Sequence, residues 1–102
     1  MNDWIQRGAC LLVLAAAALP SHAQQVEQTV GAIEAVIVAC GPIDPKSAKT
    51  GVEMLERERT QRKLDLAAVR NTDAYKSVYN AEVNRLLGLP SKARLQACQT
   101  VW

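Results

Sequence analysis

The clearest hydrophobic pattern of the chain lies between residues 26 and 40. Apolar side chains there follow one another at spacings of four, three, four and three residues: Val26, Val30, Ile33, Ile37 and Cys40. At about 3.6 residues per turn, these positions form one side of a helix. The second half of the segment is apolar on nearly every side, so we expect a buried helix from about Val26 to Ala39 or Cys40.

A second helix is predicted from Pro45 to about Val69, with Asp44 as its N-cap and proline at its first position. Its expected buried stripe changes from apolar to basic and back: Ala48, Val52, Leu55, Arg59, Arg62, Leu66 and Val69. Residues 56–63 contain no apolar side chain, so this part either stands clear of the core or forms a polar turn between two shorter helices. One long helix is the favoured prediction.

Two further helices are predicted after residue 71. Thr72 or Asp73 caps a helix over about residues 74–87, and Gly88 suits its left-handed C-terminal cap. The side chains expected to be buried on it are Tyr75, Val78 or Tyr79, Val83, Leu86 and Leu87. Pro90 and Ser91 open the last helix, where Leu95, Cys98 and Trp102 share a face. The pattern predicts an all-α fold, a small bundle of three or four helices.

The first 23 residues have the pattern of a secretory signal peptide. A polar lead with one basic residue, Arg7, precedes the apolar run 11–19, and small residues precede a cleavage position after Ala23. The run is too short to cross a bilayer, which takes about 20 residues. We predict a signal peptide at 1–23 and a single helical domain at 24–102, exported to the periplasm or beyond and without a membrane anchor after cleavage.

Cys40 and Cys98 are the only cysteines after the predicted cleavage site. In an oxidising compartment a lone pair of cysteines is expected to form a disulfide, which here joins the first helix to the last. Cys40-Gly41-Pro42 resembles the start of a thioredoxin-type motif, but Ile43 replaces the second cysteine. A helix end is the better interpretation of this tripeptide.

Charge and composition argue against several classes of function. The chain has a net charge of +2, and loss of Arg7 and Asp3 with the signal peptide leaves it unchanged. This charge is too small to predict binding to nucleic acid or to an anionic membrane. The only histidine, His22, is lost as well, so we expect no catalytic, metal or cofactor site. A hydrolase would need two carboxylates that face each other in a cleft.

Two pairs of residues are candidates for contact with a partner protein. Arg59 and Arg62 could present two guanidinium groups to a carboxylate or phosphate. The alternative is a solvated helix whose charges pair four residues apart, Glu53 with Arg57 and Glu58 with Arg62. Tyr75 and Tyr79, one turn apart, could form an amphipathic contact patch or could fill a core that lacks phenylalanine.

In outline the chain resembles small exported helical bacterial proteins with one disulfide, such as acid-activated periplasmic chaperones and periplasmic immunity proteins. The resemblance is one of architecture, and the lack of histidine removes the usual acid trigger. We expect a non-enzymatic protein that binds another protein as inhibitor, immunity protein, adaptor or chaperone. The alternative is a carrier of a small anionic or apolar ligand between helices. A cavity of a few hundred Å³ would favour the carrier, and an exposed apolar or tyrosine patch the protein binder.

Overall fold

The computed structural model describes residues 21–102, so the predicted signal peptide lies outside the described residues except for Ser21, His22 and Ala23. Five helices make up the described part: α2 (His22–Cys40), α3 (Pro45–Arg62), α4 (Leu66–Arg70), α5 (Asp73–Leu87) and α6 (Ser91–Thr100). No strand occurs among these residues, and a disulfide joins Cys40 to Cys98. The predicted all-α bundle with one disulfide is confirmed.

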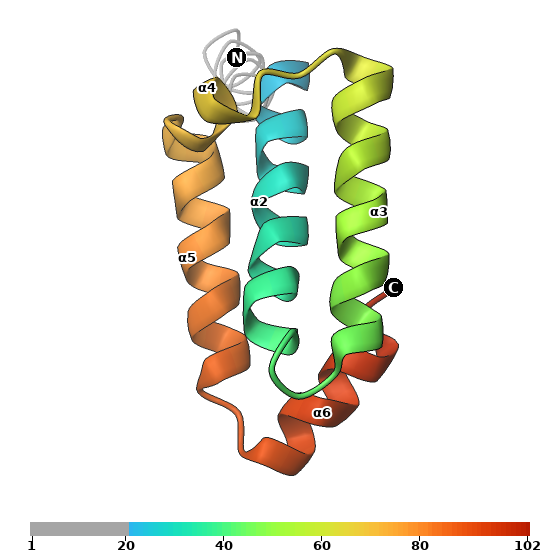
Figure 1. The fold of residues 1–102 in the computed structure, drawn as a ribbon. Coiled ribbons are helices and arrows are strands. Elements are labelled where there is room, and N and C mark those ends of the chain that lie inside the picture. The colour runs from blue at the N-terminus through green and yellow to red at the C-terminus, as the bar shows by residue number, and fades with distance from the viewer. Residues whose placement is uncertain (1–20) are drawn as a thin grey trace, which may run out of the picture.

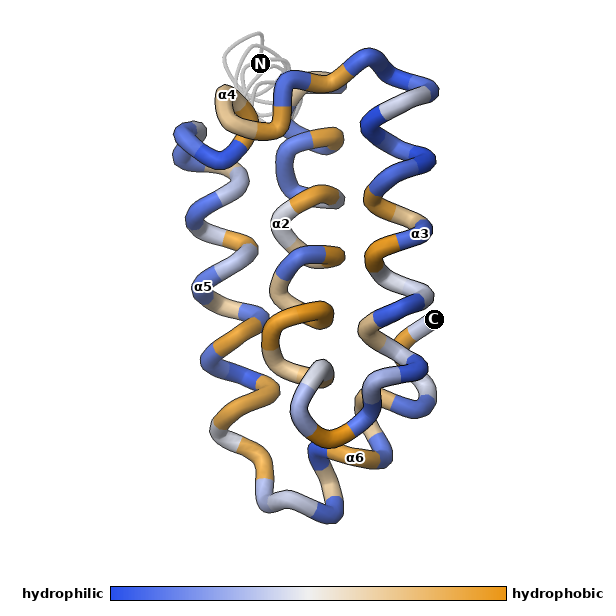
Figure 2. Tube along the Cα trace, in the orientation of Figure 1, coloured by the Kyte–Doolittle hydropathy of each residue, from blue (hydrophilic) through white to orange (hydrophobic). Residues whose placement is uncertain are grey.

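Helix α2 lies between α5 and α3, and α6 crosses below these three helices (Figure 1). This central place follows from composition, because α2 is apolar on most of its sides and is covered by two neighbours. Its lower half is the most hydrophobic part of the tube in Figure 2, whereas the upper half of α3 is strongly hydrophilic. The hydrophobic stripe predicted on α2 is therefore the axis around which the other helices pack.

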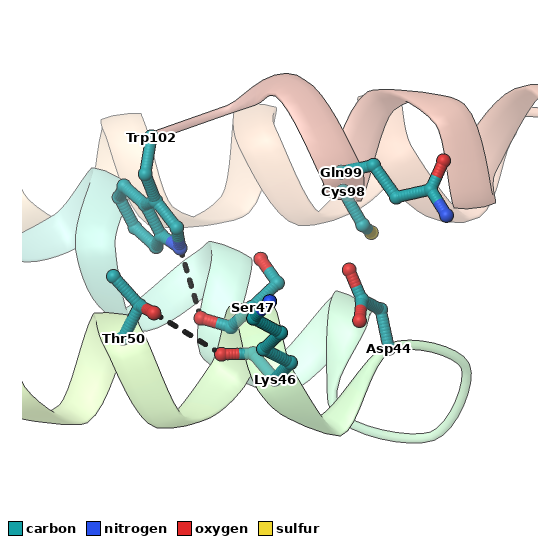
Figure 3. A pocket seen from close by; sticks show the side chains of 7 residues that line it. All are labelled: Asp44, Lys46, Ser47, Thr50, Cys98, Gln99 and Trp102. Atoms are coloured by element: carbon teal, nitrogen blue, oxygen red, sulfur yellow. Dashed lines mark hydrogen bonds between the residues drawn. The ribbon is translucent and has the colours of Figure 1, made fainter.

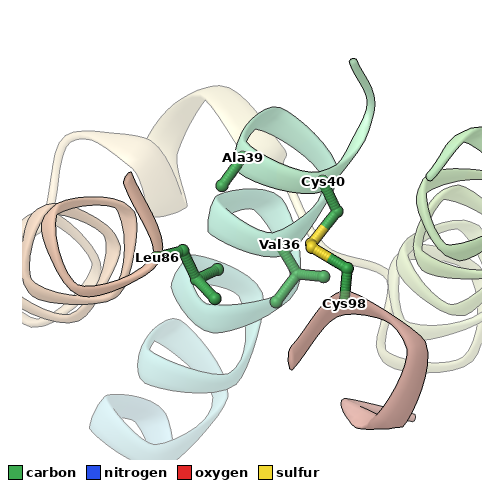
Figure 4. Packing of buried hydrophobic residues seen from close by; sticks show 5 residues of the cluster. All are labelled: Val36, Ala39, Cys40, Leu86 and Cys98. Carbon is green, nitrogen blue, oxygen red and sulfur yellow. A yellow bond between two sulfur atoms is a disulfide. The ribbon is translucent and has the colours of Figure 1, made fainter. Parts of the chain in front are cut away.

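The core contains two clusters, one around the C-terminal end of α2 and one around its middle. The lower cluster surrounds the disulfide (Figure 4) and consists of Val36, Ala39, Cys40, Leu86 and Cys98. The upper cluster consists of Val30, Val69 and Tyr75. The disulfide thus joins α2 to α6 at the point where α5 also reaches the core.

Two glycines let the helices approach one another closely. A Cβ atom at Gly31 would lie 2.8 Å from the backbone oxygen of Tyr75, so α2 and α5 are in backbone contact there. A Cβ atom at Gly51 would lie 2.7 Å from Cγ1 of Ile37, so the backbone of α3 packs directly on this side chain of α2. At both positions any larger residue would push the helices apart.

The prediction of one long helix from Pro45 to Val69 is wrong. Helix α3 ends at Arg62, and Lys63 adopts a left-handed conformation with φ of 52°. A new helix, α4, begins at Leu66 with Asp65 as its N-cap, whose carboxylate accepts a hydrogen bond of 3.3 Å from the Ala68 amide. The polar run therefore ends in a turn between two helices.

The predicted buried face of α3 is also wrong in part. Its buried residues are Ser47 and Gly51, while Val52 is 52% exposed. Leu87, expected in the core, is exposed as well. A larger side chain is excluded at position 51, because its Cβ atom would lie 2.7 Å from Ile37.

The predicted helix ends are confirmed in part. Thr72 caps α5, and its hydroxyl accepts a hydrogen bond of 3.3 Å from the Tyr75 amide. Asp44 is the N-cap of α3, but its side chain makes no capping hydrogen bond. Gly88 ends α5 in a right-handed conformation and not in the predicted left-handed one. Arg94 of α6 stabilises this end, because its guanidinium group donates to the carbonyl oxygens of Leu86, Leu87 and Leu89.

Candidate functional site

Arg59 and Arg62 lie near the end of α3, and both side chains are well exposed. The Arg62 guanidinium donates to Glu58 over 2.6 Å, which confirms the predicted pair. Arg59 pairs with Glu56, and this hydrogen-bonded contact lowers the pKa of the Glu56 carboxyl. The predicted pair between Glu53 and Arg57 is not formed. The two arginines are therefore on the surface, each held by a glutamate of the same helix.

The side of α3 that faces away from α2 forms a shallow groove, which we call the α3 outer face. It is lined by Val52, Glu53, Glu56, Arg57, Thr60 and Gln61, with a volume of about 510 Å³. These residues recur at spacings of three and four, so they share one side of the helix. On this side of the helix, the exposed Val52 is therefore followed only by charged and polar residues as far as Gln61.

Tyr75 and Tyr79 are brought together, but Tyr75 is not on the surface. Their rings are stacked with centroids 5.5 Å apart, and Tyr75 is only 7% exposed. Burial, together with a hydrogen bond to the Glu34 carboxylate, raises the pKa of Tyr75 to about 12. Tyr75 is therefore a core residue that also contacts the charged Glu34. The half-buried Tyr79 packs against the upper cluster.

Glu34 is the centre of the one ion pair that joins two different helices among residues 21–102. Arg70 of α4 donates to both of its carboxylate oxygens, with distances of 2.8 and 2.7 Å. Burial raises the pKa of Glu34, but the hydrogen bonds from Arg70 and Tyr75 outweigh it, so the net pKa is lowered. This cluster fixes the short helix α4 against α2.

A cleft lies between the first turns of α3 and the end of α6 (Figure 3). It has a volume of about 400 Å³ and is lined by Asp44, Lys46, Ser47, Thr50, Cys98, Gln99 and Trp102. The Trp102 indole N–H donates a hydrogen bond of 2.8 Å to the backbone oxygen of Ser47. Trp102 therefore packs against α3, and it shares the cleft with the disulfide.

The hydroxyl of Ser47 is a buried polar group in this cleft. Figure 3 shows it between Trp102 and Cys98, directed from α3 toward α6. The residue is 6% exposed, and its hydroxyl oxygen is fully buried without a hydrogen-bond partner. Because a buried hydroxyl without a partner is costly, such groups are rare in folded proteins.

Side chains that could bind a metal ion are dispersed over the described residues. Residues 21–102 contain no group of three His, Cys, Asp or Glu side chains placed to hold a metal ion. Asp44 is the one carboxylate that lines the cleft between α3 and α6. None of α2 to α6 is both long and apolar enough to cross a membrane.

Comparisons of this chain with family models, with curated proteins and with solved structures find no match. The site is therefore defined by its own geometry. Sequence reasoning missed Ser47, Gly51 and the pair of Glu34 with Arg70. A glycine in the middle of a predicted helix, as at 31 and 51, was the signal for a close approach.

Proposed function

We propose that this protein is an exported, non-enzymatic protein that binds another protein through the α3 outer face. The main support for this proposal is the exposed Val52, which lies at one end of a groove bordered by charged side chains. An exposed apolar side chain beside charged ones is the combination found where the apolar core of a protein interface meets its polar rim. Export is supported by the Cys40–Cys98 disulfide, because such bonds persist in oxidising compartments.

The second half of α3 is available for a partner because the fold makes little use of it. Its fully buried residues, Ser47 and Gly51, both lie in the first half of the helix. Arg59 and Arg62 are held only by exposed ion pairs, which contribute about 0.2–1 kcal/mol each. A partner carboxylate could therefore replace Glu56 or Glu58 at small cost.

The test compares two exposed valines in cells that produce the protein. A photo-crosslinking residue at Arg57 should give a discrete adduct with a partner, and Val52→Asp should abolish that adduct. Val38, on α2, is exposed to the same degree, 53% against 52%, so Val38→Asp is the matched control. Loss of the adduct in both variants, or in neither, would overturn the assignment of this face.

Arg59 and Arg62 are tested together. Arg59→Ala with Arg62→Ala should leave the unfolding midpoint within a few degrees of the wild type, because both side chains are on the surface. Neither arginine lines the α3 outer face, so this variant tests whether the partner also contacts the neighbouring edge of α3. Weaker partner capture is the expected result. An unfolded double variant would show that these arginines are structural.

A second candidate function, binding of a small ligand between helices, is favoured by the cleft between α3 and α6. Its volume of about 400 Å³ lies within the range of about 300–1,000 Å³ that small-molecule sites occupy. The buried Ser47 hydroxyl gives this cleft an unused hydrogen-bonding group. The cleft and the α3 outer face share no lining residue, so the two functions can be tested separately.

A further inference from the structure

The indole of Trp102 lies in a slot on α3 that Ser47 and Gly51 form. We call it the Ser47 slot. A Cβ atom at position 51 would lie 3.0 Å from Cζ2 of Trp102, so the ring packs directly on the glycine. The missing side chain also leaves the Ser47 carbonyl open from the side, where it accepts the indole N–H. The slot is thus shaped for a flat ring with an N–H donor.

Trp102 occupies this slot but leaves one of its hydrogen-bonding groups without a partner. Indole has one donor and no acceptor, so its N–H reaches the Ser47 carbonyl while the neighbouring Ser47 hydroxyl stays without a partner. A ring that carries an acceptor beside its N–H would pair with both groups. The slot therefore offers one more hydrogen bond than its present occupant uses.

Trp102 is also held loosely enough to leave. Val101 and Trp102 follow α6 outside the helix, and the Trp102 side chain is 41% exposed. One hydrogen bond holds the indole to α3. The Ser47 hydroxyl is fully buried under the present packing, so a ligand can reach it only when a neighbouring side chain moves, and Trp102 lies beside it in Figure 3.

We propose that the Ser47 slot binds a small, uncharged aromatic heterocycle that displaces Trp102, donates an N–H to the Ser47 carbonyl and accepts a hydrogen bond from the Ser47 hydroxyl. Asp44 and Lys46, which line the same cleft, carry opposite charges, and this favours an uncharged ligand. The inference rests on the second candidate function and names its ligand class. It is independent of the α3 outer face.

Three probes of nearly equal size test the ligand class. Indazole has an N–H and an adjacent ring acceptor, indole has the N–H alone, and 1-methylindole has no N–H. Each is titrated into the ¹⁵N-labelled protein, the Trp102→Ala variant and Trp102→Ala with Ser47→Ala. Amide and indole signals report binding, and comparison with Trp102→Phe assigns the Trp102 indole, because the sequence contains a second tryptophan, Trp4.

In Trp102→Ala, indazole should bind about tenfold more tightly than indole, as expected for one added hydrogen bond in a buried site, and 1-methylindole should bind most weakly. Adding Ser47→Ala should remove the advantage of indazole over indole. In the wild type all affinities should fall several-fold, because Trp102 competes within the same chain. Binding should then shift the Trp102 indole signal toward that of a solvated side chain.

Two outcomes overturn the proposal in different ways. Equal binding of the three probes to Trp102→Ala would reject the ligand class but leave small-ligand binding in this cleft standing. No binding of any probe at millimolar concentration would reject both. If Trp102→Ala does not fold, Trp102→Phe takes its place, since it keeps an aromatic ring at this position but removes the pyrrole ring with its N–H donor.

Discussion

Arg70 of α4 donates two hydrogen bonds, of 2.8 and 2.7 Å, to Glu34 in the middle of α2. The two residues are 36 positions apart, whereas the other three ion pairs of residues 21–102 lie within single helices. The planar guanidinium group matches the carboxylate, so both oxygens are bound. This contact holds α4 in place after the turn that ends α3.

Replacement of Arg70 should therefore cost more than replacement of an arginine in a local pair. We expect Arg70→Met to lower the free energy of unfolding by about 1 kcal/mol, because Glu34 is mostly buried and loses its charged partner. Arg85→Met, which removes the local pair with Glu82, should cost less than about 0.5 kcal/mol. Urea unfolding of the three proteins measures both, and equal costs would contradict the assigned role.

The cost of Arg70→Met should depend on pH. The folded protein lowers the pKa of Glu34 below its ordinary value, so the stabilisation is present above that ordinary value and is lost as pH falls through the folded pKa. The difference between wild type and variant should therefore be largest near neutral pH and should shrink below about pH 4. Unfolding curves at pH 7, 5 and 3 test this, and a constant difference would exclude Glu34 as the source.

Loss of the disulfide should remove a large part of the stability. The bond closes a loop of 58 residues, for which the chain-entropy estimate is about 4 kcal/mol. Cys98→Ser should lower the unfolding midpoint sharply, and reduction of the wild type should produce the same midpoint. An unchanged midpoint in Cys98→Ser would show that packing alone holds α6.

The close contact between α2 and α5 predicts that substitution of Gly31 costs more stability than substitution of Gly88, which lies outside this contact. Gly31→Ala places a methyl group 2.8 Å from the Tyr75 backbone oxygen, which should cost about 2 kcal/mol through forced separation of the helices. Gly88 has φ of −75° and ψ of −13°, a conformation open to any residue, so Gly88→Ala should cost much less. Thermal unfolding ranks the two, and a larger loss at Gly88 would contradict this arrangement.

Removal of the buried hydroxyl of Ser47 should stabilise the protein. Ser47→Ala takes away a polar group without a partner, and alanine also has the higher helix propensity. We expect a gain of about 1 kcal/mol. Ser77, exposed on α5, provides the control, because Ser77→Ala changes the helix propensity alone. If both variants gain equally, the Ser47 hydroxyl carries no penalty.

The sequence predicted the features that depend on local residue types. The stripe on α2 required only helical spacing, and the pairing of Cys40 with Cys98 required that these are the two cysteines after the predicted cleavage site. The buried face of α3 could not be found in this way. A hydrophobic pattern indicates large apolar residues, whereas the contact of α3 with α2 is made by a glycine. Gly51 faces Ile37 and Trp102, and Val52, one position on, points outward.

The end of α3 was missed for a different reason. Lys63 adopts a left-handed conformation that usually favours glycine or asparagine, so its residue type gave no warning. Asp65 before Leu66 was the available signal, since aspartate is a favourable N-cap. The candidate site depends on contacts between distant segments, such as Trp102 with Ser47, 55 residues apart, which spacing along one helix does not reveal.

The sequence order of the two cysteines also affects how the protein is made. Cys40 ends α2, and α3, α4 and α5 are all synthesised before Cys98 exists. During that interval Cys98 is not available to Cys40, and Cys10, in the predicted signal peptide, is the one other cysteine already made. The native pairing therefore has to wait until α6 has been made.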